Sequence, residues 1–481
     1  MAEEKNGQTK CPKCGSTDIS QSTKTGKLRC NFCRHQFEPE TVEKLDVSKL
    51  EGEKIGAGAR KIDKTFKGIL TLKCTSCGAE VVVDTNQVQS ARCHWCRNTL
   101  SINEKIPNGA VPDMILPFKI TKEAAREHID NFVGKRRFFA NPQFKEEFTS
   151  ENIMGVYFPY MVVDMKAKAS FHGEGEHETR RYTVTVGSGD NKRHETRYDA
   201  DLYEVGRNFD IEIKGLTVES SADKLVDAKD KTNNIINSIM PFDTENSVEW
   251  DANYLRNYTS EKRDVDVDSL KPLVNEEAKD IARYAANDTL TFYDRGVRWT
   301  EEKLDVKGTS WKSAYLPVWL YSYLEKKADK SLLHYVAVNA RTEETMGSVP
   351  IHKPKLFLIS GIVEIIGLIL MLITIPFFDE DNSWIPYVFL TLGFIYYGWI
   401  YSKYRNKSAR HYHEKETNRE MKNVRSVDNL IRRRKGLRNS KMYSANNYSV
   451  HGSFGSTDLR LEEDQSSEEE EEISEVQEED A

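Results

Sequence analysis

The cysteines are the feature of this chain that most constrains its fold. All eight lie in four C-x-x-C pairs, and the pairs form two sets with the same internal spacing of fifteen residues. Two residues between cysteines let one tight turn present both sulfurs to a single ion, and two such turns complete a tetrahedron around Zn²⁺. The sequence therefore predicts two Zn²⁺ sites, whose ligands are Cys11, Cys14, Cys30, Cys33, Cys74, Cys77, Cys93 and Cys96.

The two cysteine sets also form an internal repeat. Residues 29–34 match residues 92–97 almost position for position, and Gly15 and Gly78 each follow the second cysteine of a pair. Duplication of one small module accounts for this match. Neither ribbon buries enough apolar surface to fold without metal, so we expect both zinc ions to be structural. A closed four-cysteine shell leaves no open position for a substrate, so we do not expect catalytic zinc.

Disulfides and a redox dithiol are the alternatives to zinc. Disulfides belong to oxidising compartments, and the first five residues, MAEEK, are not a signal peptide. A redox dithiol would not occur in four paired copies. His94 lies between two cysteines and could replace one of them as a ligand, but we expect an exposed loop histidine there.

Two apolar segments occur late in the chain. Residues 356–378 contain one charge, Glu364, and would span roughly 35 Å as a helix, enough for the core of a bilayer. Residues 384–401 are a shorter apolar run, and the polar residues 379–383 between them allow only a hairpin. The alternative is a buried hairpin of a soluble domain, but the first run is apolar on all faces. We therefore predict two transmembrane helices.

Flanking charges predict the orientation of this hairpin. Lys353 and Lys355 precede the first segment, several bases follow the second from Lys403 onward, and the connecting loop has acids but no base. The positive-inside rule then places both termini in the cytosol. Reduced zinc thiolates belong on the same side, so we expect a multi-pass protein of the cell membrane.

Glu364 is unusual because it would lie well inside the bilayer. It could contact a partner, carry a proton or join two copies of the chain. The simpler interpretation is a protonated carboxyl bonded to a hydroxyl of the second helix, such as that of Tyr396 or Tyr397. We favour this interpretation or an association between the two helices.

The composition divides the chain into several domains. We expect a first zinc ribbon at 1–37, a linker at 38–65, a second ribbon at 66–103 and a cytosolic α+β domain at 110–350. The predicted fold class is thus multidomain: two small four-cysteine zinc ribbons, an α+β domain, a transmembrane hairpin and a disordered C-terminal tail.

Local patterns predict several elements of the α+β domain. Thr121 is placed to cap a helix that extends to about Phe132. Residues 182–186 and 194–198 flank a glycine-containing turn and predict a β-hairpin. Further strands are expected over 114–120, from 155 to at least 163, and over 209–218, with helices over 222–240 and 275–288.

A second, weaker repeat lies within this domain. The motif VYFPY at 156–160 resembles AYLPV at 314–318, and each is followed by another strand pattern. We infer two related β-rich halves, although chance similarity of five residues is the alternative. Pro159 and Pro317 favour strand starts or sheet edges.

The α+β domain has no catalytic motif that we recognise, such as a phosphate-binding loop or a nucleophile elbow. His172 and His177 lie in the sequence FHGEGEH, which could bind a metal but is more typical of a solvated polar turn. We assign no metal there. We therefore expect a binding or scaffolding protein and not an enzyme.

The chain ends in two oppositely charged segments. Residues 403–441 have a net charge of +10, which suggests contact with anionic lipid headgroups beside the membrane. Plain positive-inside topology and nucleic-acid binding are the alternatives. Residues 456–481 are rich in acids, and we expect a disordered tail.

The tandem ribbons, the motif at 156–160 and the apolar hairpin together resemble a bacterial group of membrane proteins. This group is described as TFIIB-type zinc-ribbon-containing, or loosely as primosomal-helicase-like. The resemblance covers most of residues 10–402. It implies a membrane protein associated with phage-shock-type or SPFH (flotillin-like) scaffolds. The chain has no P-loop, so nothing supports a helicase, and residues beyond 402 lie outside the family pattern.

Two functions follow from these features. The first is a membrane-anchored scaffold that recruits protein partners, in envelope stress or membrane organisation. The alternative is a membrane-tethered nucleic-acid binder, in which Phe32 and Trp95 would stack on bases. The first ribbon would supply its charge through Lys10, Lys13, Lys24, Lys27, Arg29 and Arg34.

Overall fold

The computed structural model describes residues 9–22, 26–43, 45–60, 69–74, 79–84, 92–95, 97, 99–100, 105–106, 112–186, 193–221, 242–263, 265–326, 331–347, 349–377, 385–405 and 448–460. The helix expected at 222–240 and most of the basic segment 403–441 lie outside these residues. The helices are α1 (Ala57–Arg60), α2 (Lys122–Gly134), α3 (Pro142–Glu147), α4 (Val267–Asn287), α5 (Lys353–Thr374) and α6 (Leu392–Arg405).

The strands form one small and one large sheet. The small sheet contains β1 (Ile19–Gln21), β2 (Leu28–Cys30) and β3 (Gln36–Phe37). Over the described residues, the large sheet has 13 strands. They are β4 (Gly52–Ile55), β5 (Ile69–Lys73), β6 (Glu80–Asp84), β7 (Lys105–Ile106), β8 (Met114–Ile115), β9 (Met154–Val186), β10 (Arg193–Glu219), β11 (Val248–Glu249), β12 (Thr259–Glu261), β13 (Gly296–Lys326), β14 (Ser331–Asn339), β15 (Thr345–Gly347) and β16 (Tyr448–Arg460).

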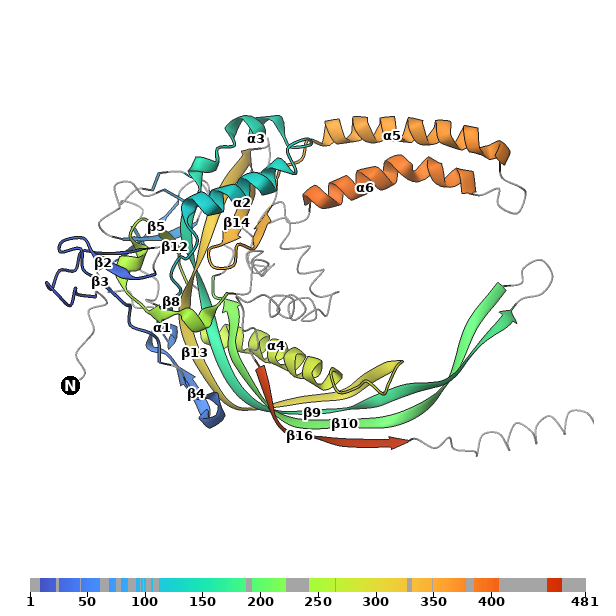
Figure 1. The fold of residues 1–481 in the computed structure, drawn as a ribbon, viewed down its shortest axis with the longest axis horizontal. Coiled ribbons are helices and arrows are strands. Elements are labelled where there is room, and N and C mark those ends of the chain that lie inside the picture. Colours follow the sequence, from blue (N-terminus) through green and yellow to red (C-terminus); the bar gives the residue numbers. More distant parts are fainter. Residues whose placement is uncertain are drawn as a thin grey trace, which may run out of the picture.

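Three very long antiparallel strands organise the large sheet. β9 pairs with β10 on one side and with β13 on the other, and the three curve away from the rest of the sheet as a ribbon (Figure 1). The predicted hairpin at 182–198 is confirmed as the distal part of β9 and β10, in which Val186 pairs with Arg193.

The sequence FHGEGEH is strand and not the polar turn that we expected. Its glycines are needed because the neighbouring chain passes close to them. A Cβ at Gly173 would lie 2.4 Å from the carbonyl oxygen of Arg298, and one at Gly175 would lie 2.7 Å from the ring of Tyr293. These glycines therefore allow neighbouring residues to pack closely against the strand, and they do not form a turn.

The two repeat motifs pair with each other. Val156 lies opposite Val318 and Tyr160 opposite Ala314, so residues 156–160 and 314–318 form one antiparallel ladder. The prolines lie inside long strands and not at strand starts. Their carbonyls accept hydrogen bonds from Ser220 and Ala340, just beyond the points where β10 and β14 stop pairing. Each proline nitrogen therefore points toward the end of a neighbouring strand. No paired residue lies opposite it there, so the missing N–H removes no hydrogen bond from the ladder.

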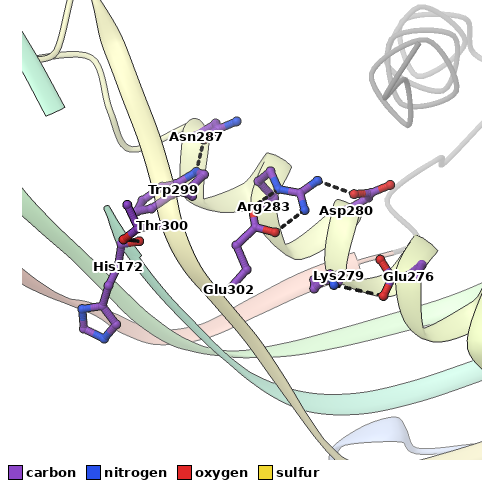
Figure 2. Close-up of polar contacts among 9 residues, drawn as sticks. All are labelled: His172, Glu276, Lys279, Asp280, Arg283, Asn287, Trp299, Thr300 and Glu302. Atoms are coloured by element: carbon purple, nitrogen blue, oxygen red, sulfur yellow. Dashed lines mark hydrogen bonds and ion pairs between the residues drawn. The ribbon is translucent and has the colours of Figure 1, made fainter. Parts of the chain in front are cut away.

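Helix α4 covers the inner side of the curved ribbon (Figure 1). The residues Arg283 and Glu302 form a two-pronged ion pair between α4 and β13, and the Trp299 Nε1–H donates to Asn287 Oδ1 at 3.0 Å (Figure 2). The backbone carbonyl of His172 accepts a bond from the Thr300 hydroxyl at 3.2 Å. This region is thus a structural junction between helix and ribbon.

The predicted helix at 121–132 is confirmed as α2. Thr121 caps it, because its side chain accepts a hydrogen bond from the N–H of Ala124. Ala125, Ile129 and Val133 form its buried face. Local periodicity and capping were sufficient to predict this element.

The segment expected to be a linker, 38–65, is part of the fold over its described residues. Strand β4 pairs in parallel with β13, from Gly52 opposite Gly308 to Ile55 opposite Trp311. Asp113 accepts hydrogen bonds from the N–H groups of Gly58 and Ser313, and burial raises its pKa. Parallel pairing with a strand so distant in sequence leaves no local pattern, which is why the sequence suggested a linker.

Helices α5 and α6 lie side by side and extend away from the sheet (Figure 1). Among the described residues, only α5 is long and apolar enough to cross a membrane. The second predicted helix, 384–401, is not a single α-helix: Ile385–Thr391 form a 3-10 helix (η11), and α6 follows. The expectation of two full α-helical spans is therefore corrected to one long helix and one composite segment.

Glu364 joins these two segments. Its Oε2 accepts a hydrogen bond from the backbone N–H of Gly393 at 2.8 Å, in the first turn of α6. Helix N-termini have N–H groups without helical partners, so a carboxylate oxygen is well suited to this position. The association between helices that we favoured is thus observed, although the donor is a backbone N–H and not a tyrosine hydroxyl.

The base of the helical pair is fixed to the loop between α2 and α3. The N–H of Phe139 donates to the Tyr404 hydroxyl at 3.2 Å, and the N–H of His352 donates to the Phe139 carbonyl at 2.8 Å. Phe139, Leu356, Ile400 and Tyr404 form a small buried cluster there. The α2–α3 loop therefore holds both helices at one end.

The chain returns to the large sheet after α6. Strand β16 pairs with β10, from Tyr448 opposite Ile213 to Arg460 opposite Tyr203. Residues 456–460, which we had assigned to the disordered tail, are thus the last part of this strand. Residues 461–481 lie outside the described part of the chain.

Candidate metal centre

The first cysteine set is brought together as predicted. The Cys11 and Cys33 sulfurs are 3.5 Å apart, and those of Cys14 and Cys30 are 3.6 Å apart. All four sulfurs lie within 4.8 Å of one another. A tetrahedral Zn²⁺ with bonds of about 2.3 Å would separate its sulfurs by about 3.8 Å. The set therefore has the donors and spacing that zinc requires.

Two matching turns place these sulfurs. The N–H of Gly15 donates to the carbonyl of Cys11, and the N–H of Arg34 donates to the carbonyl of Cys30, at 2.8 and 2.9 Å. Gly15 and Arg34 both have positive φ, at 74° and 60°. Glycine adopts this conformation without strain, whereas Arg34 adopts it because the turn requires it.

The thiols of this set differ in acidity. The backbone N–H of Cys33 lowers the pKa of the Cys30 thiol to about 6. A hydrogen bond from the backbone of Ser16 lowers the pKa of Cys14, but desolvation and the three other thiols together outweigh it and raise this pKa to about 12. Four thiolates repel one another, so a divalent cation is needed for all four to ionise together.

The first ribbon is docked on the α+β domain. Asp18 pairs with Arg256, and Gln21 Nε2 donates to the Phe118 carbonyl at 3.0 Å. Ile19 and Leu28 are fully buried in the same apolar cluster as Phe118. The metal centre is thus fixed to the body of the protein and does not move on a free tether.

The second cysteine set is described only in part. Cys74 and Cys93 are buried, whereas Cys77 and Cys96 lie outside the described residues. The backbone around the described pair repeats the first set. The N–H of Cys74 donates to the Ala79 carbonyl as that of Cys11 does to Ser16, and the N–H of Arg97 donates to the Cys93 carbonyl as that of Arg34 does to Cys30. Arg97 also has positive φ, at 64°.

This second ribbon is part of the core and not a separate domain. Strand β6 pairs with β12, and Cys74 and Cys93 pack in one apolar cluster with Phe158 and Leu316. No local pattern indicates this packing, because β5 and β6 look like an isolated hairpin. The predicted boundary at 66–103 therefore does not separate two domains in the fold.

His94 is fully buried and not the exposed loop residue that we expected. Its Nε2 lies 3.6 Å from Glu261 Oε2, and its ring packs against those of Trp95 and Phe158. The Trp95 Nε1–H donates to the same Glu261 oxygen at 3.2 Å. Glu261 is far from the cysteines in sequence. Its contacts with the turn that follows Cys93 are therefore visible only in the tertiary structure.

Phe32 and Trp95 occupy equivalent positions in the two sets but have opposite surroundings. Phe32 is 78% exposed, whereas Trp95 is 0% exposed. Trp95 therefore cannot stack on a nucleic-acid base, as the alternative function required. Lys27, one of the bases assigned to nucleic acid, pairs with Glu38 at 2.8 Å.

Comparisons with protein-family models, curated proteins and solved structures found no match for this chain. The resemblance to zinc-ribbon membrane proteins thus stays a prediction. The geometry itself defines a sheet-rich protein with one complete four-cysteine centre and one long apolar helix among its described residues.

Proposed function

We propose that this protein is a membrane-anchored scaffold whose zinc-bearing body recruits protein partners at the cytosolic face. Two structural zinc ions stabilise the body in this proposal, one in each cysteine set. Helices α5 and α6, with η11, cross the membrane as a hairpin. Phage-shock-type and SPFH-like proteins are the partners that the resemblance suggests.

The observation that carries the anchor is the exposed apolar surface of α5. This helix contacts α6 and η11 along one side, and its other large side chains face outward. Soluble monomers rarely expose an apolar patch of this extent, whereas lipid would cover it. The exposed side chains of α5 include Phe357, Leu358, Ile362, Ile365, Ile366, Leu368, Ile369, Leu370, Leu372 and Ile373.

The pairing of β16 supports a two-span topology. β16 follows the hairpin in the chain, and its partner β10 precedes it. Two strands of one sheet must lie on the same side of a membrane. If α5 crosses the bilayer, the chain must therefore cross back before residue 448, and η11 with α6 is the apolar segment available for this.

The direction of the curved ribbon limits how the hairpin can enter a bilayer. Figure 1 shows the distal parts of β9 and β10 extending to the same side of the sheet as α5 and α6. This part of the ribbon has charged side chains, such as Arg180, Arg181 and Arg197, and belongs in water. The proposal thus requires the hairpin to be inclined away from the ribbon when it enters a bilayer.

The first ribbon offers the surface for recruitment. Phe32 is exposed at the turn of a metal centre that is fixed to the body, so a partner can bury it without ordering a flexible segment. Exposed aromatic residues on rigid elements are frequent anchors of protein interfaces. A closed four-cysteine shell has no site for substrate, which favours binding over catalysis.

Crosslinking in cells followed by recovery from washed membranes tests the proposal. Cys14→Ser/Cys33→Ser opens the first centre, and Phe32→Ala changes only its surface. We expect both variants to stay in the membrane and to lose most crosslinked protein. Unchanged recovery of partners with both variants would refute recruitment by the first ribbon. Recovery of the chain in the soluble fraction would refute the anchor.

A further inference from the structure

Two lysines from different elements converge on one backbone oxygen at the base of the hairpin. Lys355 Nζ, from the first turn of α5, donates to the Phe138 carbonyl at 2.9 Å. Lys145 Nζ, from α3, lies 3.4 Å from the same oxygen. Phe138 is 59% exposed, and Lys355 Nζ lies 3.8 Å from the centre of its ring.

No carboxylate neutralises this cluster within the described part of the chain. None of Arg137, Lys145 and Lys355 forms an ion pair there, whereas several exposed bases of β13 each pair with an acid. The pKa of Lys145 is lowered by partial burial and by the nearby positive charges of Lys355 and Arg137. Lys145 and Lys355 thus meet at one oxygen without a counter-charge from the described residues, and Arg137 is the residue next to Phe138 in the chain.

The helix itself makes this arrangement unfavourable without an anion. Lys353 and Lys355 lie in the first turn of α5, where the helix dipole already creates a positive field. The lysines near this base lie over aromatic rings and not beside acids: Lys353 over Tyr401, Lys355 over Phe138 and Lys403 over Trp399. Aromatic rings and lysines are the side chains that mark a membrane–water interface.

We propose that Arg137, Lys145 and Lys355 bind the phosphate of an anionic lipid headgroup, with Phe138 inserted beside it among the lipids. This inference rests on the proposed membrane anchor and names a specific lipid site on it. The site is separate from the basic segment 403–441, because Arg137 and Lys145 belong to the soluble domain. It would fix the soluble body against the bilayer at a defined point.

Native mass spectrometry of the full chain in detergent micelles tests this site. The protein is titrated with phosphatidylglycerol or phosphatidylcholine of the same acyl chains, with and without millimolar inorganic phosphate. We expect a preference of roughly tenfold or more for phosphatidylglycerol. Arg137→Gln/Lys145→Gln/Lys355→Gln should reduce this preference to less than about threefold.

Two further variants serve as controls. Arg298→Gln/Lys303→Gln/Lys307→Gln removes the same charges from exposed positions of β13 that are paired with acids, and it should keep the preference. Arg137→Lys/Lys145→Arg/Lys355→Arg keeps the three positive charges and should also keep the preference for phosphatidylglycerol. Retained binding in this variant shows that these positions act through charge and not through folding.

The opposite outcomes overturn the inference. An unchanged preference in the glutamine variant, or an equal loss in the β13 control, excludes a specific site. Full competition by inorganic phosphate indicates a site for a free anion and not for a lipid. Alkaline extraction of membranes distinguishes a failure of the lipid-site proposal from a failure of the membrane-anchor proposal. A chain that stays in the membrane without lipid preference refutes only the lipid site, whereas a soluble chain refutes the proposed function.

Discussion

At the residue scale, equivalent residues of the two cysteine repeats have different roles. The repeat predicts similar surroundings for Phe32 and Trp95, yet one is exposed and the other lies against Phe158 and Tyr335. The difference arises because the second turn packs into the large sheet and the first does not. The two repeats thus keep the same backbone turn while their surroundings differ.

This difference predicts unequal effects on stability. Trp95→Ala removes a buried ring and leaves Glu261 without one donor, so we expect a loss of about 3–5 kcal/mol in the free energy of unfolding. Phe32→Ala should change it by about 0.5 kcal/mol or less. Urea unfolding of the full chain in micelles, followed by tryptophan fluorescence and circular dichroism, measures both values. Equal losses would contradict the assigned positions.

The metal content gives a second test at this scale. We expect two zinc ions in the wild-type chain and one in either Cys14→Ser or Cys74→Ser. Cys74 is buried in the core, so its substitution should also lower the melting temperature of the whole body more than Cys14→Ser does. Elemental analysis and thermal unfolding measure these quantities. A wild-type content of one zinc would refute the second centre.

At the element scale, the sequence predicted what depends on neighbouring residues. The cap of α2, the hairpin of β9 and β10, and the turns of the first zinc ribbon all follow from local spacing. It did not predict that residues 52–55 pair with β13, or that β6 joins β12. Such contacts join residues far apart in sequence, and so does the contact between His94 and Glu261.

The close approach of α5 to η11, just before α6 begins, makes a prediction of its own. A Cβ at Gly367 would lie 2.3 Å from the Phe389 carbonyl oxygen, whereas one at Gly361 would meet open space. Gly367→Leu should therefore separate the helices and break the bond from Gly393 to Glu364, whereas Gly361→Leu should be tolerated. Hydrogen exchange of the α6 amides in micelles measures this. Equal exchange in both variants would contradict the observed packing.

At the scale of the whole molecule, the proposed anchor requires the hairpin and the ribbon to separate in a membrane. Both extend to the same side of the sheet (Figure 1), and among the described helices α5 alone is apolar and long enough to cross a membrane. Fluorophores at Thr183 of β9 and Thr374 of α5 should therefore show less energy transfer in bilayer nanodiscs than in micelles. Equal transfer in the two environments would contradict the inclination of the hairpin.

The central claim is that a hairpin holds the zinc-bearing body at one face of a membrane. Labelling of intact cells with a membrane-impermeant maleimide tests it most directly, with wild type as the control for the native cysteines. We expect Asp381→Cys, between the two spans, to react in intact cells. Gly7→Cys and Ser466→Cys, near the two ends, should react only after permeabilisation. Labelling of either end in intact cells, or protection of Asp381→Cys, would contradict the claim.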